Sequence, residues 1–251
     1  MVSQRSRKSE TQVETKIIDA HAHVGRFGSW ANVSCTAEEL LGKMDAAGVE
    51  KAVLFAPDNA QVRAAVTAHP TRFVGYVWPN PHDKGALSLV MDAVKRWGFR
   101  GIKLHPLIHA FLPTDEEVLP LIEFARKEKI PVAIHSGHPP FSLPWSIGEL
   151  AELYPEVRVV MLHMGHAHGV YIQAAINTAK KYDNIILETS GVSMHSKIKE
   201  AVDEVGEQRV VFGSDYPFHD YSVELQKVRV AGLTEAQREL VLYENAKTLL
   251  V

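Results

Sequence analysis

Five short apolar segments of this chain each lead to a side chain that could bind a metal ion or move a proton. An apolar run that stops at a polar residue places that residue at the carboxyl end of a strand, which is where catalytic groups gather in a (β/α)8 barrel. We therefore expect these side chains, although far apart in the sequence, to meet at one rim. They are His21 and His23, Lys103 and His105, His135, His163, and Asp215.

The most direct chemistry for this set is a metal centre. His21 and His23 are two residues apart on a predicted strand, so both imidazoles point to the same side. A lone His-x-His pair is a weak signal, but His135 and Asp215 follow later strands. Three imidazoles and a carboxylate suit one divalent ion with an open position, with Zn²⁺ favoured and Mn²⁺ an alternative. Such an ion lowers the pKa of its bound water toward about 7.

Two of these residues are candidates for catalysis. Asp215 could accept the proton of the metal-bound water while also binding the metal, or it could simply begin the turn before Pro217. His163 is predicted to orient or deprotonate the water, or to polarise the bond that breaks; its alternative role is a fourth histidine ligand. Asp19 shares the side of His21, where it could hydrogen-bond a ligand histidine or serve a structural role.

Four residues are predicted to bind the substrate: Lys103, His105, Trp78 and Arg26. Lys103 has three interpretations: a free ammonium for a substrate carboxylate, which we favour, a structural ion pair, or a carboxylated bridge between two metals. Trp78 belongs to a set of aromatic residues after strands that could form an apolar pocket wall. Arg26 could hold an anionic substrate or be merely exposed.

The remaining histidines are less informative. His166 and His168 form a second His-x-His pair, but they lie where a helix should begin, so the strand spacing does not apply and no metal role is predicted. His109, His138 and His219 follow strand ends and are candidates to line the pocket.

The elements that must position these residues alternate regularly. Capping boxes at Thr36 and Thr114 predict helices to about Ala47 and Lys129, and amphipathic segments fill other gaps. Runs rich in Val, Ile and Leu recur about every 22–34 residues, the length of a strand–helix unit. The pattern predicts an α/β fold, a (β/α)8 TIM barrel of parallel strands buried on both faces. The eight predicted strands are 17–24, 51–56, 73–78, 99–105, 131–136, 157–163, 184–189 and 209–214.

Composition sets the remaining limits. The 251 residues suit one barrel, and we expect a polar flexible tail over 1–15 and a single domain over 16–251. A net charge of −3 gives no basic surface for nucleic acid or membrane. The single cysteine, Cys35, excludes an intrachain disulfide and fits a reducing compartment, so we expect a cytoplasmic protein.

These motifs, in this order, resemble the amidohydrolase superfamily, in particular its amidohydrolase-2 branch, which includes aminocarboxymuconate-semialdehyde decarboxylase. The resemblance spans about residues 16–251 and implies a distorted (β/α)8 barrel with its site at the carboxyl-terminal face. It implies His21, His23, His135 and Asp215 as ligands of one metal and His163 as the water-activating residue. It also implies a possible homodimer. The matching stretches include Ile18 to His23, Gly98 to Pro106, Pro131 to His135, Leu162 to Gly165, Phe212 to Pro217, and Glu244 to Ala246.

Our leading hypothesis is a metal-dependent hydrolase that cleaves a C–N or C–O bond of a small amide, lactone or ester with a metal-activated water. The alternative is a metal-dependent, non-oxidative decarboxylase of an unsaturated or aromatic carboxylic acid. A third, less favoured hypothesis is a non-catalytic metal-binding scaffold.

Overall fold

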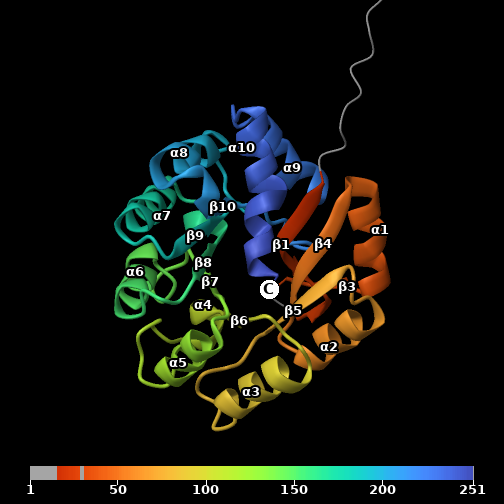
Figure 1. The fold of residues 1–251 in the computed structure, drawn as a ribbon, viewed down its shortest axis with the longest axis vertical. Coiled ribbons are helices and arrows are strands. Elements are labelled where there is room, and N and C mark those ends of the chain that lie inside the picture. Colours follow the sequence, from red (N-terminus) through yellow and green to blue (C-terminus); the bar gives the residue numbers. More distant parts are fainter. Residues whose placement is uncertain (1–15, 29–30, 251) are drawn as a thin grey trace, which may run out of the picture.

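The computed structural model describes residues 16–28 and 31–250, and the predicted tail, residues 1–15, lies outside them. Eight parallel strands form one sheet in the order β1-β4-β5-β6-β7-β8-β9-β10, with helices on its outer face (Figure 1). The strands are β1 (Ile17–His23), β4 (Val49–Phe55), β5 (Phe73–Val77), β6 (Gly101–Leu104), β7 (Val132–His135), β8 (Val159–Leu162), β9 (Ile185–Glu188) and β10 (Val210–Val211).

The sheet closes on itself just beyond β10. The backbone N–H of Ala20 donates to the carbonyl of Phe212 at 2.9 Å, and that of Asp215 donates to the carbonyl of His21 at 2.7 Å. The last predicted strand, 209–214, is shorter than expected, because residues after Val211 leave the ladder and Asp215 has a φ of 56°. The predicted TIM barrel is confirmed, with its eighth strand reduced to a short pair followed by a loop.

Helices connect successive strands, as the alternation predicted. Thr36 and Glu39 form the expected capping box of α1, but Thr114 does not open a helix. Instead Asp115 accepts a hydrogen bond from the backbone N–H of Leu112 at 2.7 Å, and α5 begins five residues later. The helices are α1 (Ala37–Ala47), α2 (Asn59–Ala68), α3 (Ala86–Arg96), α4 (Pro106–His109), α5 (Leu119–Glu128), α6 (Pro144–Leu153), α7 (Gly169–Lys181), α8 (Ser196–Val205), α9 (Tyr221–Val230) and α10 (Glu235–Glu239).

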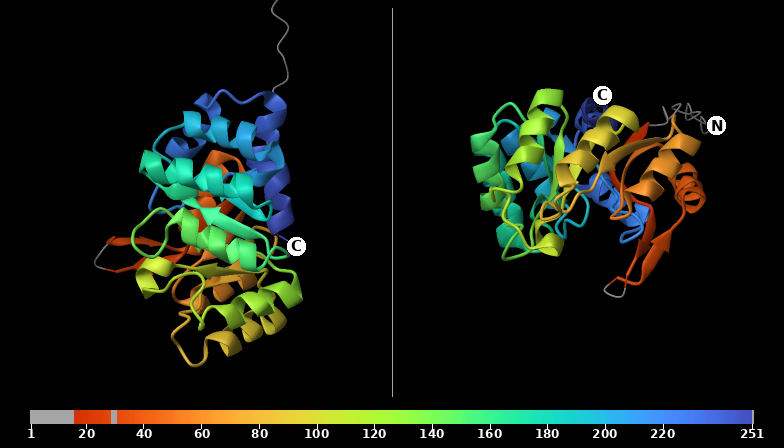
Figure 2. Two further views of the ribbon diagram at one scale, coloured as in Figure 1. Left: turned by 90° about the vertical axis from the view of Figure 1, so that its left-hand side faces the viewer. Right: turned by 90° about the horizontal axis from the view of Figure 1, so that it is seen from below.

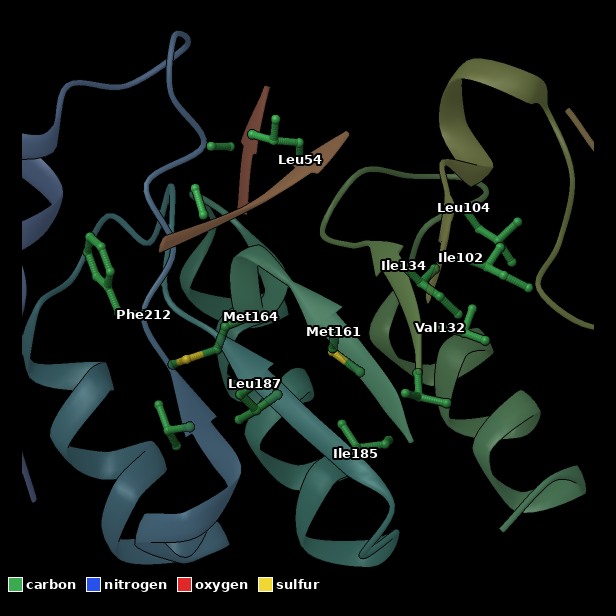
Figure 3. Close-up of a cluster of buried hydrophobic side chains, with 14 of the residues drawn as sticks. Leu54, Ile102, Leu104, Val132, Ile134, Met161, Met164, Ile185, Leu187 and Phe212 are labelled. Carbon is green, nitrogen blue, oxygen red and sulfur yellow. The ribbon is translucent and has the colours of Figure 1, made fainter. Parts of the chain in front are cut away.

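The apolar core has two parts, because each barrel strand buries both faces. One part lies between strands and helices, where residues such as Ile102, Ile134 and Leu187 pack (Figure 3). The other fills the barrel interior and includes Phe55 and Tyr76. The hydroxyl of Tyr76 donates to the carbonyl of Leu249 at 2.8 Å, so the C-terminal turns η3 (Leu240–Glu244) and η4 (Asn245–Leu249) adjoin the barrel interior.

Two features lie outside the repeating pattern. A hairpin of β2 (Gly25–Phe27) and β3 (Val33–Cys35) follows β1 and projects from the body of the molecule (Figure 2). A short 3₁₀ turn, η1 (His163–Gly165), follows β8, and a second, η2 (Glu207–Arg209), precedes β10. Within residues 16–28 and 31–250, no helix has both the length and the apolar character needed to cross a bilayer.

Candidate metal centre and substrate cavity

Three of the predicted ligands converge at the carboxyl end of the barrel. The Nε2 atoms of His21 and His23 lie 3.1 Å apart, and Oδ1 of Asp215 lies 3.2 Å and 3.0 Å from them, respectively. All three side chains are buried. Ligands about 2.1 Å from one ion and roughly at right angles to each other are about 3 Å apart, so this spacing fits one divalent cation.

The hydrogen bonds behind the two imidazoles show why a cation fits. Nδ1 of His23 lies 3.1 Å from the carbonyl of Phe55, which can only accept, so Nδ1 carries the proton. Nδ1 of His21 lies 3.1 Å from the carboxylate of Glu188 and donates to it in the same way. In neutral imidazoles both Nε2 atoms are then acceptors, and they face the Asp215 carboxylate, a third acceptor. Burial lowers the pKa of His21 well below its usual range, which keeps that ring neutral.

Glu188 also reaches a second catalytic candidate. Its Oε2 accepts from the hydroxyl of Ser190 at 2.8 Å, and that hydroxyl lies 3.0 Å from Nδ1 of His163. The backbone N–H of His163 donates to the same carboxylate at 3.1 Å. Glu188 therefore sets the tautomer of His21 directly and that of His163 through Ser190, leaving Nε2 of His163 available to a ligand. Burial raises the pKa of Glu188 to about 8, and a cation bound at His21 would favour its ionised form.

Glu188 is a site residue that the sequence analysis did not identify. It ends the strand Ile185–Glu188 in the same way that His135 ends its own strand, so the rule applied to the other residues would have found it. Potential ligand atoms of His21, His163 and Glu188 also lie close together, in addition to those of the His21–His23–Asp215 triad.

Asp19 holds the backbone of the metal centre and does not contact an imidazole. It accepts from the backbone N–H groups of His21 and Ser214, each at 2.9 Å, and from the hydroxyls of Ser214 at 2.5 Å and Tyr221 at 2.6 Å. Four donors satisfy one buried carboxyl group, although burial still raises its pKa to about 6. Asp19 thus joins β1 to the loop that carries Asp215.

The loop that carries His163 has an unusual backbone. Four consecutive residues, His163 to His166, have positive φ angles between 47° and 85°. Three of them are not glycine, and such conformations cost of order 1–3 kcal/mol each where the surroundings impose them. This turn brings His166 to the cavity, whereas His168 caps α7 by accepting from the N–H of Val170 at 3.3 Å. The second His-x-His pair is therefore split.

His135 lies beside the His21–His23–Asp215 triad. Its ring centroid is 4.7 Å from that of His163, and its Nε2 lies 2.8 Å from Nδ1 of His138. The rings of Trp78, His105, His135 and His138 form a stacked row with successive interplanar angles of 5°, 14° and 12°. The structure brings the fourth predicted ligand to the site with Nε2 directed at His138, and its metal role stays a prediction.

A cavity of about 590 Å³ opens above the triad. Its walls combine histidines with apolar side chains, a mixture typical of small-molecule sites. Predicted residues Lys103, His105 and Trp78 line it, and so do His138 and His219, whereas His109 does not. The lining residues are His21, His23, Phe27, Trp78, Lys103, His105, Leu107, Ile108, His135, His138, His163, His166, Asp215, Phe218 and His219.

Lys103 is the one Lys or Arg side chain on this lining. It is 1% exposed, and its Nζ lies 5.0 Å and 5.5 Å from the ring centroids of Phe55 and Trp78. Within the described residues it has no hydrogen-bond or ion-pair partner, so the predicted structural ion pair is not observed. Burial lowers its pKa to about 7, while Asp215 and Glu188 act in the opposite direction.

Arg26 lies outside the cavity. It is exposed on β2, opposite Ser34 of β3, while its neighbour Phe27 points into the cavity lining. Successive strand residues point to opposite faces, so only one of the two can reach the site. The prediction that Arg26 binds substrate is not supported by this placement.

Comparison with known proteins identifies the family. Residues 18–250 match the family model described as Amidohydrolase, so the chain belongs to this family and is an enzyme of the amidohydrolase superfamily. The predicted resemblance is thereby confirmed.

Several similar proteins have a named activity. A gamma-resorcylate decarboxylase from a Polaromonas species is 23% identical over 241 residues, covering 73% of this chain and 72% of the relative. The structure of 5-carboxyvanillate decarboxylase from Sphingomonas paucimobilis has a TM-score of 0.75 and 18% identity, covering 94% of this chain and 99% of that one. The structure of 2,6-dihydroxybenzoate decarboxylase from Rhizobium has a TM-score of 0.72 and 16% identity, covering 94% and 98%.

These findings correct the leading functional hypothesis. The named relatives are decarboxylases of aromatic acids, so the prediction of a hydrolase is wrong and the alternative is the better supported one. Structures of a Polaromonas dihydroxybenzoic acid decarboxylase and a Novosphingobium 5-carboxyvanillate decarboxylase contain manganese. A divalent metal is therefore supported, whereas the preference for zinc is not confirmed.

Proposed function

We propose that this protein is a metal-dependent, non-oxidative decarboxylase of a hydroxylated aromatic carboxylic acid. The observation that carries the proposal is Lys103, a buried amino group without a hydrogen-bond or ion-pair partner among the described residues, on the cavity beside the His21–His23–Asp215 triad. Burial without a partner disfavours the charged form of this lysine, and an anionic substrate would favour it by pairing with the ammonium. The likeness to decarboxylases of aromatic acids supports the same substrate class.

The lining suits an aromatic ring. Trp78, Phe27 and Phe218 provide flat apolar surfaces, and Leu107 and Ile108 extend them. An aromatic acid would place its ring against this wall, with the ammonium of Lys103 binding an anionic oxygen and His105 packed on Trp78 fixing the indole. Water is displaced from the apolar part of the cavity, which strengthens the electrostatic contacts that remain.

His21, His23 and Asp215 would hold the divalent ion, Mn²⁺ or Zn²⁺, with His135 as the fourth protein ligand. Such an ion, when bound, would act as a Lewis acid that stabilises negative charge on the substrate. Nε2 of His163, oriented through Ser190 and Glu188, hydrogen-bonds a substrate oxygen. Asp215 takes up one proton from water in each turnover and delivers it to the ring carbon that carries the carboxylate. The C–H bond forms, the C–C bond breaks, and CO₂ leaves while the bonding pair stays on the ring, so no oxidant is needed.

The test is CO₂ release from 2,6-dihydroxybenzoate and related hydroxybenzoates by protein reconstituted with Mn²⁺ or Zn²⁺. We expect equal amounts of CO₂ and the decarboxylated phenolic product (resorcinol from 2,6-dihydroxybenzoate) from the wild type, and a loss of at least about 100-fold in kcat for Asp215→Asn. Asp92→Asn, on the exposed surface of α3, is the control and should match the wild type. Equal turnover by wild type and Asp215→Asn would contradict the proposed role of the carboxylate.

A further inference from the structure

A pair of residues beyond the metal centre, His219 and Glu224, has no role in the chemistry described above. His219 lines the cavity and is partly exposed, with its Nε2 3.8 Å from Oδ2 of Asp215. Glu224 lies on α9 (Tyr221–Val230), and its side chain is 1% exposed. The two residues are in contact, with Nδ1 of His219 3.6 Å from Oε1 of Glu224.

The two oxygens of Glu224 have different surroundings. Oε2 is satisfied by the ammonium of Lys227 at 2.6 Å and by the backbone N–H of Gly191 at 3.3 Å. Oε1 is buried and has no hydrogen-bond partner among the described residues. A buried acceptor without a donor is unfavourable, and Nδ1 of His219 is close enough to donate after a small rotation of the ring. Glu224 is thus placed to hold the proton of neutral His219 on Nδ1.

That tautomer has a consequence for the cavity. With its proton on Nδ1, His219 presents Nε2 as an acceptor, and Oδ2 of the ionised Asp215, before it takes up the proton used in the reaction, is an acceptor too. Two acceptors 3.8 Å apart do not bond to each other, but a hydroxyl group between them can donate to either one. We propose that His219, oriented by Glu224, is a specificity-determining residue. It accepts a hydrogen bond from a second ring hydroxyl ortho to the substrate carboxylate, an inference that rests on the proposed function.

The same contacts allow a simpler role, in which His219 only steadies Asp215. The two roles predict different results. A positioning role affects metal binding and every aromatic ligand equally, whereas recognition of a hydroxyl affects only ligands that carry it. The comparison therefore needs a matched pair of ligands that differ in one hydroxyl group.

The experiment measures, by calorimetry, binding of 2-nitroresorcinol and 2-nitrophenol to the Mn²⁺-loaded protein. These probes are not decarboxylated, and they differ only in the second hydroxyl. The readout is the Kd of 2-nitrophenol divided by the Kd of 2-nitroresorcinol. This ratio is compared between variants so that the ligands' own acidities cancel. We expect a ratio of about 10 or more in the wild type, since one good hydrogen bond corresponds to about tenfold in affinity.

Three variants complete the design. His219→Phe should bring the ratio to about 1–2. Glu224→Gln should do the same. The amide oxygen of the glutamine would accept from Lys227, as Oε2 of Glu224 does, so the amide N–H₂ would face His219. Nδ1 of His219 would then have to accept, which places the ring proton on Nε2. His69→Phe is the control, since His69 is similarly exposed, at 32% against 34%, and does not line the cavity. Its ratio should equal that of the wild type.

The outcomes separate the two proposals. A wild-type ratio near 1, with both ligands bound, overturns this inference but leaves the decarboxylase proposal standing. An unchanged ratio in His219→Phe also overturns the inference. If binding of both ligands weakens equally in that variant and Mn²⁺ is lost, His219 instead serves to hold Asp215 in place. Failure of the wild type to bind either ligand contradicts the proposed function itself.

Discussion

The buried ammonium of Lys103 gives the most quantitative prediction. Replacing it with methionine should stabilise the metal-free protein at low pH, because the folded state then no longer buries a charge without a partner. The pKa of Lys103 is lowered from 10.5 to about 7 by burial, a difference of 3.5. At about 1.36 kcal/mol per pKa unit, the cost is close to 5 kcal/mol, and loss of the contacts with Phe55 and Trp78 reduces the gain to roughly 3–5 kcal/mol.

The two pKa values of Lys103, about 7 in the folded state and 10.5 in the unfolded state, also determine how its effect on stability changes with pH. Below pH 7 the lysine is charged in both states, and the folded protein bears the full cost. Between pH 7 and 10.5 the unfolded chain binds more protons than the folded one, so wild-type stability rises with pH. The advantage of Lys103→Met should therefore be largest at pH 6 and shrink to about 1 kcal/mol at pH 9.5.

Urea unfolding of the metal-free proteins at pH 6 and 9.5 measures this difference. Lys84→Met, at an exposed lysine outside the cavity lining, is the matched control and should change stability by less than about 0.5 kcal/mol. A Lys103→Met protein that is less stable than the wild type at both pH values, or a pH-independent difference, would refute the reasoning. The same variant should lose binding of aromatic carboxylates, which calorimetry can measure.

Three further substitutions test the surroundings of the metal centre. Glu188→Gln should lower Mn²⁺ affinity about 10–100-fold, measured by equilibrium dialysis, because His21 and His163 lose their orienting carboxylate. Gly213→Ala should cost about 1–3 kcal/mol in unfolding free energy, since the added Cβ would lie 2.9 Å from that of His21 and closer still to Glu188; wild-type stability would exclude this clash. Tyr221→Phe should cost about 2 kcal/mol by removing a donor to buried Asp19, whereas an unchanged melting curve would show that Asp19 does not need it.

Much of the fold was predictable because the local signals agreed with each other. Continuous apolar strands separated by amphipathic helices indicated the barrel, and the polar residues at strand ends located the cavity. Two differences between the structure and the predictions have physical causes. Thr114 does not cap a helix, because Asp115 instead accepts from the backbone N–H of Leu112 and stabilises a turn. Arg26 faces solvent because Phe27 occupies the inward position on the same strand.

The site was predictable in part for a similar reason. Residue type identified the histidines and Asp215, but Glu188 was overlooked because a lone glutamate at a strand end resembles an ordinary polar residue. His219 and Glu224 are only five residues apart, on either side of the start of α9, but their contact depends on the backbone path into the helix, which the sequence analysis did not predict. The choice of reaction was wrong because a metal-ligand set does not distinguish hydrolysis from decarboxylation, a distinction that depends on what the rest of the cavity binds.

In the proposed reaction, a metal held by His21, His23 and Asp215 supports decarboxylation of an aromatic acid. The most direct measurement follows ¹³CO₂ release from carboxyl-labelled hydroxybenzoates by chelator-stripped protein, before and after addition of Mn²⁺, with bound metal quantified in the same samples. We predict no release from stripped protein, recovery with about one Mn²⁺ per chain, and neither binding nor recovery in His21→Ala. Release that is independent of bound metal, or none from any hydroxybenzoate at full Mn²⁺ occupancy, would contradict the claim.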